Sequence, residues 1–206
     1  MKILALELSS SIGSVALLDG SVAVFSVEFA NDRKHSGSFF EKLRECRQRF
    51  GNADRVVAGL GPGSYAGTRI AIATAIGLQA ATGAELLGLP SICALSANID
   101  DVYGVIGDAR RQSFFFAEVR NREAADGPML LNEEELRGRL ALFPHPVFTT
   151  EPLPLFPQAS VRRPSALVLA QMALIPAPVT AEVPLEPIYL REPHITQAKA
   201  VPFSTL

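Results

Sequence analysis

The chain has 206 residues, of which 48% are hydrophobic and 19% are charged. This composition excludes an intrinsically disordered chain, and the length is enough for one domain or two small ones. The formal net charge is −2, and no run of basic residues contains interleaved aromatics. The chain therefore lacks the large basic surface of a protein that binds nucleic acid on its own.

The cysteines and the first residues bear on the compartment. Cys46 and Cys93 lie far apart in apolar surroundings, so we expect buried free thiols and a reducing compartment. The N-terminal stretch is too short for a signal peptide, and the most apolar helical segment is shorter than a membrane span. We expect a cytoplasmic protein that does not associate with membranes.

The first half of the chain predicts a meander followed by alternating helices and strands. Hydrophobic alternation and the Asp19-Gly20 turn indicate three antiparallel strands. Ser38-Phe-Phe-Glu41 has the spacing of a capping box, which would begin a helix there. The expected strands are 2–8, 14–18, 21–29, 56–60 and 85–89, and the expected helices are 38–50 and 68–82.

The second half begins in the same way, with a hairpin at 102–107 and 113–119. A helix with Asn132 as its cap is expected at 132–142, and a shorter one at 165–174. Ten of the 15 prolines fall within 144–187, which predicts a loop-rich region. The order of elements predicts an α/β protein of two βββαβα-type lobes, at 1–100 and 101–206, with the second lobe reduced.

The glycine-rich segment 59–69, Gly-Leu-Gly-Pro-Gly-Ser-Tyr-Ala-Gly-Thr-Arg, follows a strand and opens a helix. Backbone N–H groups and the helix dipole make such a loop a natural anion site. The segment matches a dinucleotide-binding fingerprint, but the N-terminal meander is wrong for a doubly wound sheet. The Walker lysine is missing. The alternative is a tight strand-to-helix turn without a ligand.

Several residues could surround a phosphate or a nucleotide with Mg²⁺. Glu7 at the end of the first strand is followed by Ser9-Ser10-Ser11, which could place a carboxylate beside hydroxyls and turn N–H groups. In the phosphate loop of actin-like ATPases an acidic residue at this place organises a hydrated Mg²⁺, although serines in a turn also bond their own backbone. Asp108-Ala-Arg110-Arg111 is either a small contact site or a solvated turn. The candidate nucleotide- or phosphate-binding residues are Glu7, Ser9, Ser10, Gly61, Gly63, Ser64 and Asp108.

The helix expected after this loop has hardly any polar face. An ordinary surface helix has an apolar stripe and a polar side, so this helix should be buried nearly all round, in its own domain or against another protein. Arg69 in its first turn would then need a partner for its guanidinium.

We identify no catalytic centre and no metal site. His35, His145 and His194 are scattered and form no metal-binding pair. His35-Ser36 precedes a helix, where Ser36 is better explained as a cap than as a nucleophile.

Five segments, taken together and in order, resemble the bacterial TsaB (YeaZ) family. They are Leu4-Ala-Leu-Glu-Leu-Ser-Ser10, Arg33-Lys-His-Ser36, Gly61-Pro-Gly-Ser-Tyr-Ala-Gly-Thr-Arg69-Ile-Ala, Asp108-Ala-Arg110-Arg111 and Pro187-Ile-Tyr-Leu-Arg191. The glycine-rich segment is the most specific. Family members usually open with Ile-Asp-Thr-Ser, where this chain has Leu6-Glu7-Leu8-Ser9.

The resemblance implies an actin/Hsp70/sugar-kinase-like (ASKHA) fold. It also implies a non-catalytic subunit required to make threonylcarbamoyladenosine beside the anticodon of tRNA. The implied partners are a TsaD-like transferase and a TsaE-like ATPase, with tRNA bound indirectly and a homodimer forming when the partner is absent. ATP or ADP with Mg²⁺ could sit at a subunit interface. No activity is expected of the chain alone.

The resemblance further implies that the two helices of the first lobe pack against a partner subunit. Small residues at four-residue spacing let two helix backbones approach closely. Ile72→Asp or Ala73→Arg should then break pairing while the monomer still folds. The expected interface residues are Phe39, Leu43, Cys46, Gly67, Arg69, Ala71, Ile72, Ala73, Ala75, Ile76 and Gly77. The alternative is a stand-alone ATP-dependent phosphotransferase or ATPase of the same fold.

Overall fold

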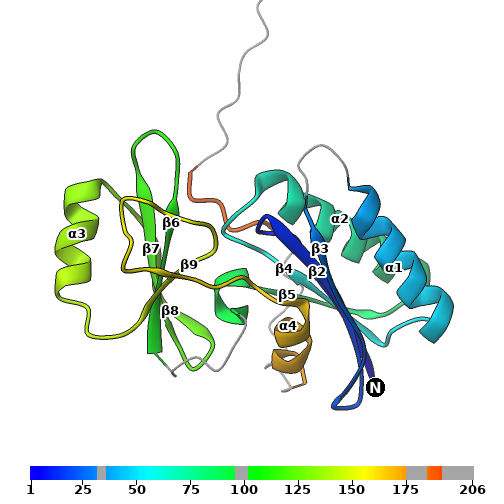
Figure 1. Ribbon diagram of the computed structural model, residues 1–206. Helices are drawn as coiled ribbons and strands as arrows, with labels where there is room; N and C mark the ends of the chain where they lie inside the picture. Colours follow the sequence, from blue (N-terminus) through cyan, green and yellow to red (C-terminus); the bar gives the residue numbers. More distant parts are fainter. Residues whose placement is uncertain (32–35, 96–101, 175–184, 192–206) are drawn as a thin grey trace, which may run out of the picture.

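The computed structural model describes residues 1–31, 36–95, 102–174 and 185–191. These residues form two lobes that lie side by side, each built on a five-stranded sheet (Figure 1). None of the helices in these ranges is long and apolar enough to cross a membrane.

The first lobe contains β1 (Lys2–Glu7), β2 (Ile12–Asp19), β3 (Val22–Ala30), α1 (Gly37–Phe50), β4 (Arg55–Gly59), α2 (Tyr65–Thr82), β5 (Glu85–Leu89) and the 3₁₀ helix η1 (Ser91–Ala94). The strand order is β3-β2-β1-β4-β5. β1, β2 and β3 form the expected antiparallel meander. β4 pairs parallel to β1, and β5 pairs parallel to β4.

The second lobe contains β6 (Val102–Asp108), β7 (Phe114–Arg120), β8 (Glu123–Leu131), α3 (Glu133–Ala141), β9 (Val147–Thr149), β10 (Ser160–Val161) and α4 (Ala166–Met172). Its strand order, β10-β9-β6-β7-β8, repeats that of the first sheet. Where α2 joins the fourth and fifth strands of the first lobe, the second lobe has only a loop between β9 and β10. The predicted repeat with a reduced second lobe is therefore confirmed.

The central strand β1 of the first sheet is buried on both faces, which explains its almost continuous apolar run. Leu4 and Leu6 pack with α1 and α2 on one face, and Ile3 and Ala5 pack with α4 on the other. α4 thus follows the second sheet in sequence but packs against β1, β2 and β4 of the first (Figure 1).

Three details of the local structure differ from the sequence prediction. α1 begins at Gly37 after Ser36, whose side chain makes no capping hydrogen bond, so the capping box expected at Ser38 is not formed. α2 begins at Tyr65, three residues early, because the Ser64 side chain caps it by accepting from the backbone N–H of Gly67. The strand β8, the short β9 and β10, and η1 were not predicted.

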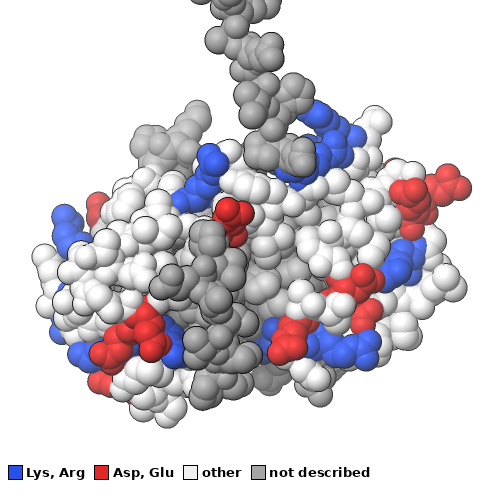
Figure 2. All heavy atoms as spheres, turned by 180° about the vertical axis from the view of Figure 1, so that it is seen from behind, with Lys and Arg blue, Asp and Glu red and all other residues white. Residues whose placement is uncertain are grey.

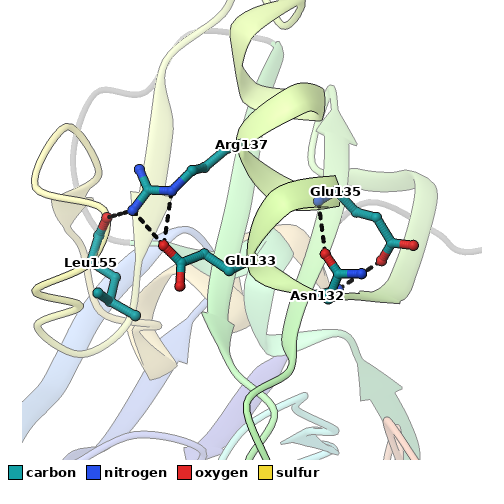
Figure 3. Close-up of polar contacts among 5 residues, drawn as sticks. All are labelled: Asn132, Glu133, Glu135, Arg137 and Leu155. Carbon is teal, nitrogen blue, oxygen red and sulfur yellow. Dashed lines mark hydrogen bonds and ion pairs between the residues drawn. The ribbon is translucent and has the colours of Figure 1, made fainter.

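The cap expected at Asn132 is present. Its side-chain oxygen accepts from the backbone N–H of Glu135 at 2.9 Å, and the Glu135 carboxylate accepts from the backbone N–H of Asn132 at 2.7 Å (Figure 3). This reciprocal capping box fixes the start of α3. One turn on, the Arg137 guanidinium donates to Glu133 and to the carbonyl of Leu155, which ties the helix to the loop after β9 (Figure 3).

Candidate functional site

The glycine-rich loop between β4 and α2 uses its own backbone N–H groups to hold the first lobe together. The N–H of Gly61 donates to the Ser91 hydroxyl at 2.9 Å, and the N–H of Ser64 donates to the carbonyl of Ser9 at 2.6 Å. The N–H of Gly67 is capped by Ser64. Three of the donors that would cradle a phosphate are therefore already engaged.

Two glycines of this loop are needed for close packing against the turn between β1 and β2. A Cβ atom on Gly63 would lie 2.1 Å from the carbonyl oxygen of Ser9, and one on Gly67 would lie 2.0 Å from that of Leu8. Gly61 differs, since its φ of +85° is the left-handed conformation that favours glycine. Packing of the loop on the first turn thus accounts for its glycines without a ligand.

Glu7 lies beneath this loop with none of its surface exposed. One carboxylate oxygen accepts from the backbone N–H of Ser9 at 2.6 Å, and the other, Oε2, has no partner. Burial raises the pKa of the Glu7 carboxyl above its usual value of 4.5, and its hydrogen bonding to Ser9 opposes that rise. Gly59 faces Oε2, so closely that a Cβ there would collide with it.

A cleft of about 710 Å³ separates the two lobes. Four of the predicted nucleotide- or phosphate-binding residues line it: Ser9, Gly63, Ser64 and Asp108. The other three do not. Glu7 is buried below the loop, Gly61 bonds Ser91, and the Ser10 hydroxyl donates to the carbonyl of Ile12 within its own turn. Ser10 therefore matches the alternative prediction, in which the serines of this turn bond their own backbone.

Asp108 enters the cleft at the end of β6, but its carboxylate is occupied locally. Its two oxygens accept from the backbone N–H of Arg110 at 2.6 Å and from the Arg110 guanidinium at 3.1 Å. Arg110, Arg111 and Gln112 follow with φ values of 65°, 54° and 58°. Such a run of non-glycine residues in the left-handed region is uncommon and costs conformational energy.

Arg69 is exposed, which corrects the expectation that its guanidinium would be buried. Its Nε donates to the hydroxyl of Tyr189 at 3.0 Å, and its guanidinium carbon lies 4.5 Å from the centre of the Tyr65 ring. The two tyrosine rings are 5.7 Å apart. Neither tyrosine is among the site residues predicted from the sequence, where their only signal is their place in the segments that resemble the family.

Residues 185–191 join the two lobes beside this cluster. The N–H of Ile188 donates to the carbonyl of Leu60 at 2.8 Å, whereas the guanidinium of Arg191 donates to the hydroxyl of Ser113 in the second lobe at 2.7 Å. The carboxyl-terminal part of the described chain therefore forms one wall of the cleft.

The expected interface residues separate into two groups. One group faces the first sheet and belongs to its core: Phe39, Leu43, Cys46, Gly67, Ala71, Ile72 and Ala75. The other is exposed on α2: Arg69, Ala73, Ile76 and Gly77. Residues of the first group are buried in the free chain, so Ile72→Asp would disturb the monomer itself. Ala73→Arg remains a test of pairing.

Both cysteines are free and buried. Burial raises the pKa of the Cys46 thiol to about 11 and that of Cys93 to about 12, so neither is a reactive thiolate. The described residues hold no group of three or more His, Cys, Asp or Glu side chains that could bind a metal ion. His35 and His194 lie outside the described residues.

Comparison with known protein sequences finds a matching family model and a relative. Residues 34–130 match the family model of TsaD, tRNA N6-adenosine threonylcarbamoyltransferase. An uncharacterized protein of Mycobacterium leprae is 30% identical over 147 residues. That match covers 68% of this chain but spans only 38% of the length of the relative.

Two solved structures from Pseudomonas aeruginosa share the fold. One, an uncharacterized protein with similarity to the peptidase YEAZ, has a TM-score of 0.68 and 22% identity, covering 92% of this chain and 99% of that one. The other, YeaZ itself, has a TM-score of 0.66 and 21% identity, covering 84% of this chain and 91% of that one.

The two like sheets, each with its meander and parallel strands, have the expected α/β fold of the actin/Hsp70/sugar-kinase-like type. Within that class the fold is the YeaZ fold, and the middle of the chain matches the TsaD family. Both findings agree with the resemblance to the TsaB (YeaZ) family that the motifs indicated.

Proposed function

We propose that this chain is a non-catalytic subunit of the machinery that transfers threonylcarbamoyl to the adenosine beside the anticodon of tRNA. One observation carries the proposal: the TsaD family match runs from residue 34 to 130 and so includes α1, β4 and α2 within a YeaZ fold. A chain that shares α1, β4 and α2 with the transferase family is suited to pair with a transferase through these elements.

The exposed side of α2 is the surface that supports such pairing. Two rows of small residues run along this helix at four-residue spacing. The row of Gly67, Ala71 and Ala75 is buried against the sheet, and the row of Ala73, Gly77 and Ala81 is exposed. Ile76 beside the second row is 44% exposed, and a Cβ on Gly77 would have no neighbour within 4 Å.

Apolar surface exposed in this way favours a partner, and small side chains allow a close helix crossing. Phe40 on α1 adds a second large apolar side chain, 48% exposed. We propose that this face docks a TsaD-like transferase, that a homodimer uses the same face when the transferase is absent, and that a TsaE-like ATPase completes the assembly.

Reconstitution tests this function. The chain is combined with its cognate TsaD-like and TsaE-like proteins, the threonylcarbamoyl-adenylate synthase, ATP, bicarbonate, threonine and tRNA, and each protein is omitted in turn. We expect modification to require this chain and the chain alone to hydrolyse no ATP. Equal modification of tRNA in its absence would show that the proposal is wrong.

The interlobe cleft supports a second candidate, a stand-alone ATP-dependent enzyme. The cleft has the size of a small-molecule site and brings together Ser9, Gly63, Ser64 and Asp108. Its weakness is that the loop N–H groups and the Asp108 carboxylate are already bonded within the chain. Calorimetric titration with Mg-ATP separates the two, because this candidate alone requires saturable binding and turnover by the isolated chain.

A further inference from the structure

Arginine and tyrosine side chains gather around the mouth of the interlobe cleft. Tyr65, Arg110, Tyr189 and Arg191 line the cavity, and Arg69 joins Tyr65 to Tyr189. In Figure 2 basic side chains lie along the upper edge of the molecule on the side of the second lobe. We call this set the rim: Tyr65, Arg69, Arg110, Arg111, Tyr189 and Arg191.

The charge of the rim is local. The whole chain carries a net charge of −2, yet the rim contains four arginines, while the carboxylates that line the same cleft are those of Asp108 and Glu151. Asp108 is held against Arg110. All four arginines are exposed, so they can reach a ligand outside the cavity. Such an arrangement attracts a polyanion to one place on an otherwise acidic protein.

The aromatic side chains are equally accessible. Tyr65 is 53% exposed and Tyr189 is 37% exposed, although large aromatic side chains are usually covered. The Arg69 guanidinium lies 4.5 Å from the centre of the Tyr65 ring and 6.0 Å from that of Tyr189, and both residues keep exposed surface for a stacking partner. Exposed aromatic rings beside arginines are typical of surfaces that bind unpaired bases and their phosphates.

The geometry points to a strand rather than to a free nucleoside triphosphate. A triphosphate needs a cradle of free N–H groups, and those of Gly61, Ser64 and Gly67 are taken. The rim instead spreads its cations over both lobes, from α2 to the turn between β6 and β7. The left-handed backbone of Arg110 and Arg111 keeps that turn in an uncommon conformation, which is frequent at functional sites.

We propose that the rim binds single-stranded RNA, with bases stacking on Tyr65 and Tyr189 and phosphates contacting the arginines. The choice of the tRNA anticodon loop as this RNA rests on the proposed function. The subunit would then contact the tRNA directly, whereas the family resemblance by itself implied only an indirect contact.

Fluorescence anisotropy tests this proposal with a labelled anticodon stem-loop and the whole chain at several salt concentrations. We expect Tyr65→Ala to weaken binding about fivefold or more, the effect of losing one stacked base. We expect Arg191→Ala to reduce the slope of log affinity against log salt by about 0.7, the contribution of one phosphate on a single strand.

Arg49→Ala is the matched control, because it removes one exposed arginine from the end of α1, away from the rim. Its binding should equal that of the unsubstituted chain, and circular dichroism melts should show that all variants fold. Rim variants that bind like Arg49→Ala would overturn the proposal. Displacement of the RNA by millimolar ATP would also overturn it, in favour of a free nucleotide.

A duplex RNA of the same length is the second probe. Weaker binding of the duplex is expected, since its bases cannot reach the tyrosines. If the rim variants bind RNA normally but reconstituted modification still requires the chain, the rim proposal is wrong and the proposed function stands. If the rim binds RNA but modification does not require the chain, the proposed function is wrong and the bound RNA is not assigned to tRNA.

Discussion

Gly63→Ala is the substitution whose cost the structure defines most sharply. The new Cβ would lie 2.1 Å from the carbonyl oxygen of Ser9 and 3.0 Å from its carbonyl carbon. Ordinary contacts begin near 3.4 Å, so backbone on one side must move by more than an ångström. Neither group is the flexible end of a side chain, and the strain therefore cannot be relieved by a rotamer change.

The expected loss of stability has two parts. Overpacking of this kind costs about 1–3 kcal/mol. The shift also strains the hydrogen bond from the N–H of Ser64 to Ser9, whose loss adds about 1 kcal/mol. We expect the free energy of unfolding to fall by about 2–4 kcal/mol, from the sum of these two effects.

Urea unfolding followed by circular dichroism measures this loss, with Gly138→Ala as the matched control. Gly138 lies in α3, and a Cβ there would meet nothing within 4 Å. Alanine in a helix interior should stabilise by about 0.5–1 kcal/mol. A Gly63→Ala variant as stable as Gly138→Ala would refute the packing of the loop on the first turn. The N–H groups of the glycine-rich loop would then be free to bind a phosphate.

Two further predictions concern Glu7 and α2. Burial raises the pKa of Glu7 above 4.5, so its stabilising contribution should be fully present below pH 4.5 and be lost as the pH rises through the folded pKa. Glu7→Gln should abolish this dependence, and parallel curves of unfolding free energy against pH for the two proteins would contradict it. Ile72→Ala should destabilise the monomer by about 2–5 kcal/mol because Ile72 is core, whereas Ile76→Ala on the exposed side should change stability by about 0.5 kcal/mol or less. Equal thermal shifts would show that the helix faces are assigned wrongly.

The sequence predicted the architecture because the sheet strands are strongly patterned. The run from Ile3 to Leu6 is apolar on both faces, and the Asp19-Gly20 turn sets the hairpin. β8 escaped prediction because its sequence includes Gly127-Pro128, which usually breaks a strand. It is tolerated at the edge of the second sheet, where proline removes no essential ladder bond.

The site was harder to predict, because the two sides of α2 are similar in sequence and the residues that meet at the cleft lie far apart in the chain. α2 is apolar all round, so the row of Gly67 and Ala71 and the row of Ala73 and Gly77 looked equally suited to a partner. Only the packing of α2 against the sheet shows that the first row is buried and the second is exposed. Arg69 meets Tyr189 across 120 positions of the chain, and no local pattern connects residues so far apart.

Sedimentation velocity of the mixed subunits tests most directly whether the exposed side of α2 docks a TsaD-like transferase, as we propose. The unsubstituted chain should form a complex with the cognate transferase. Ile76→Asp, which places a carboxylate at a side chain 44% exposed in the free chain, should abolish that complex while the monomer keeps its melting temperature. A complex of unchanged affinity with Ile76→Asp would contradict the account.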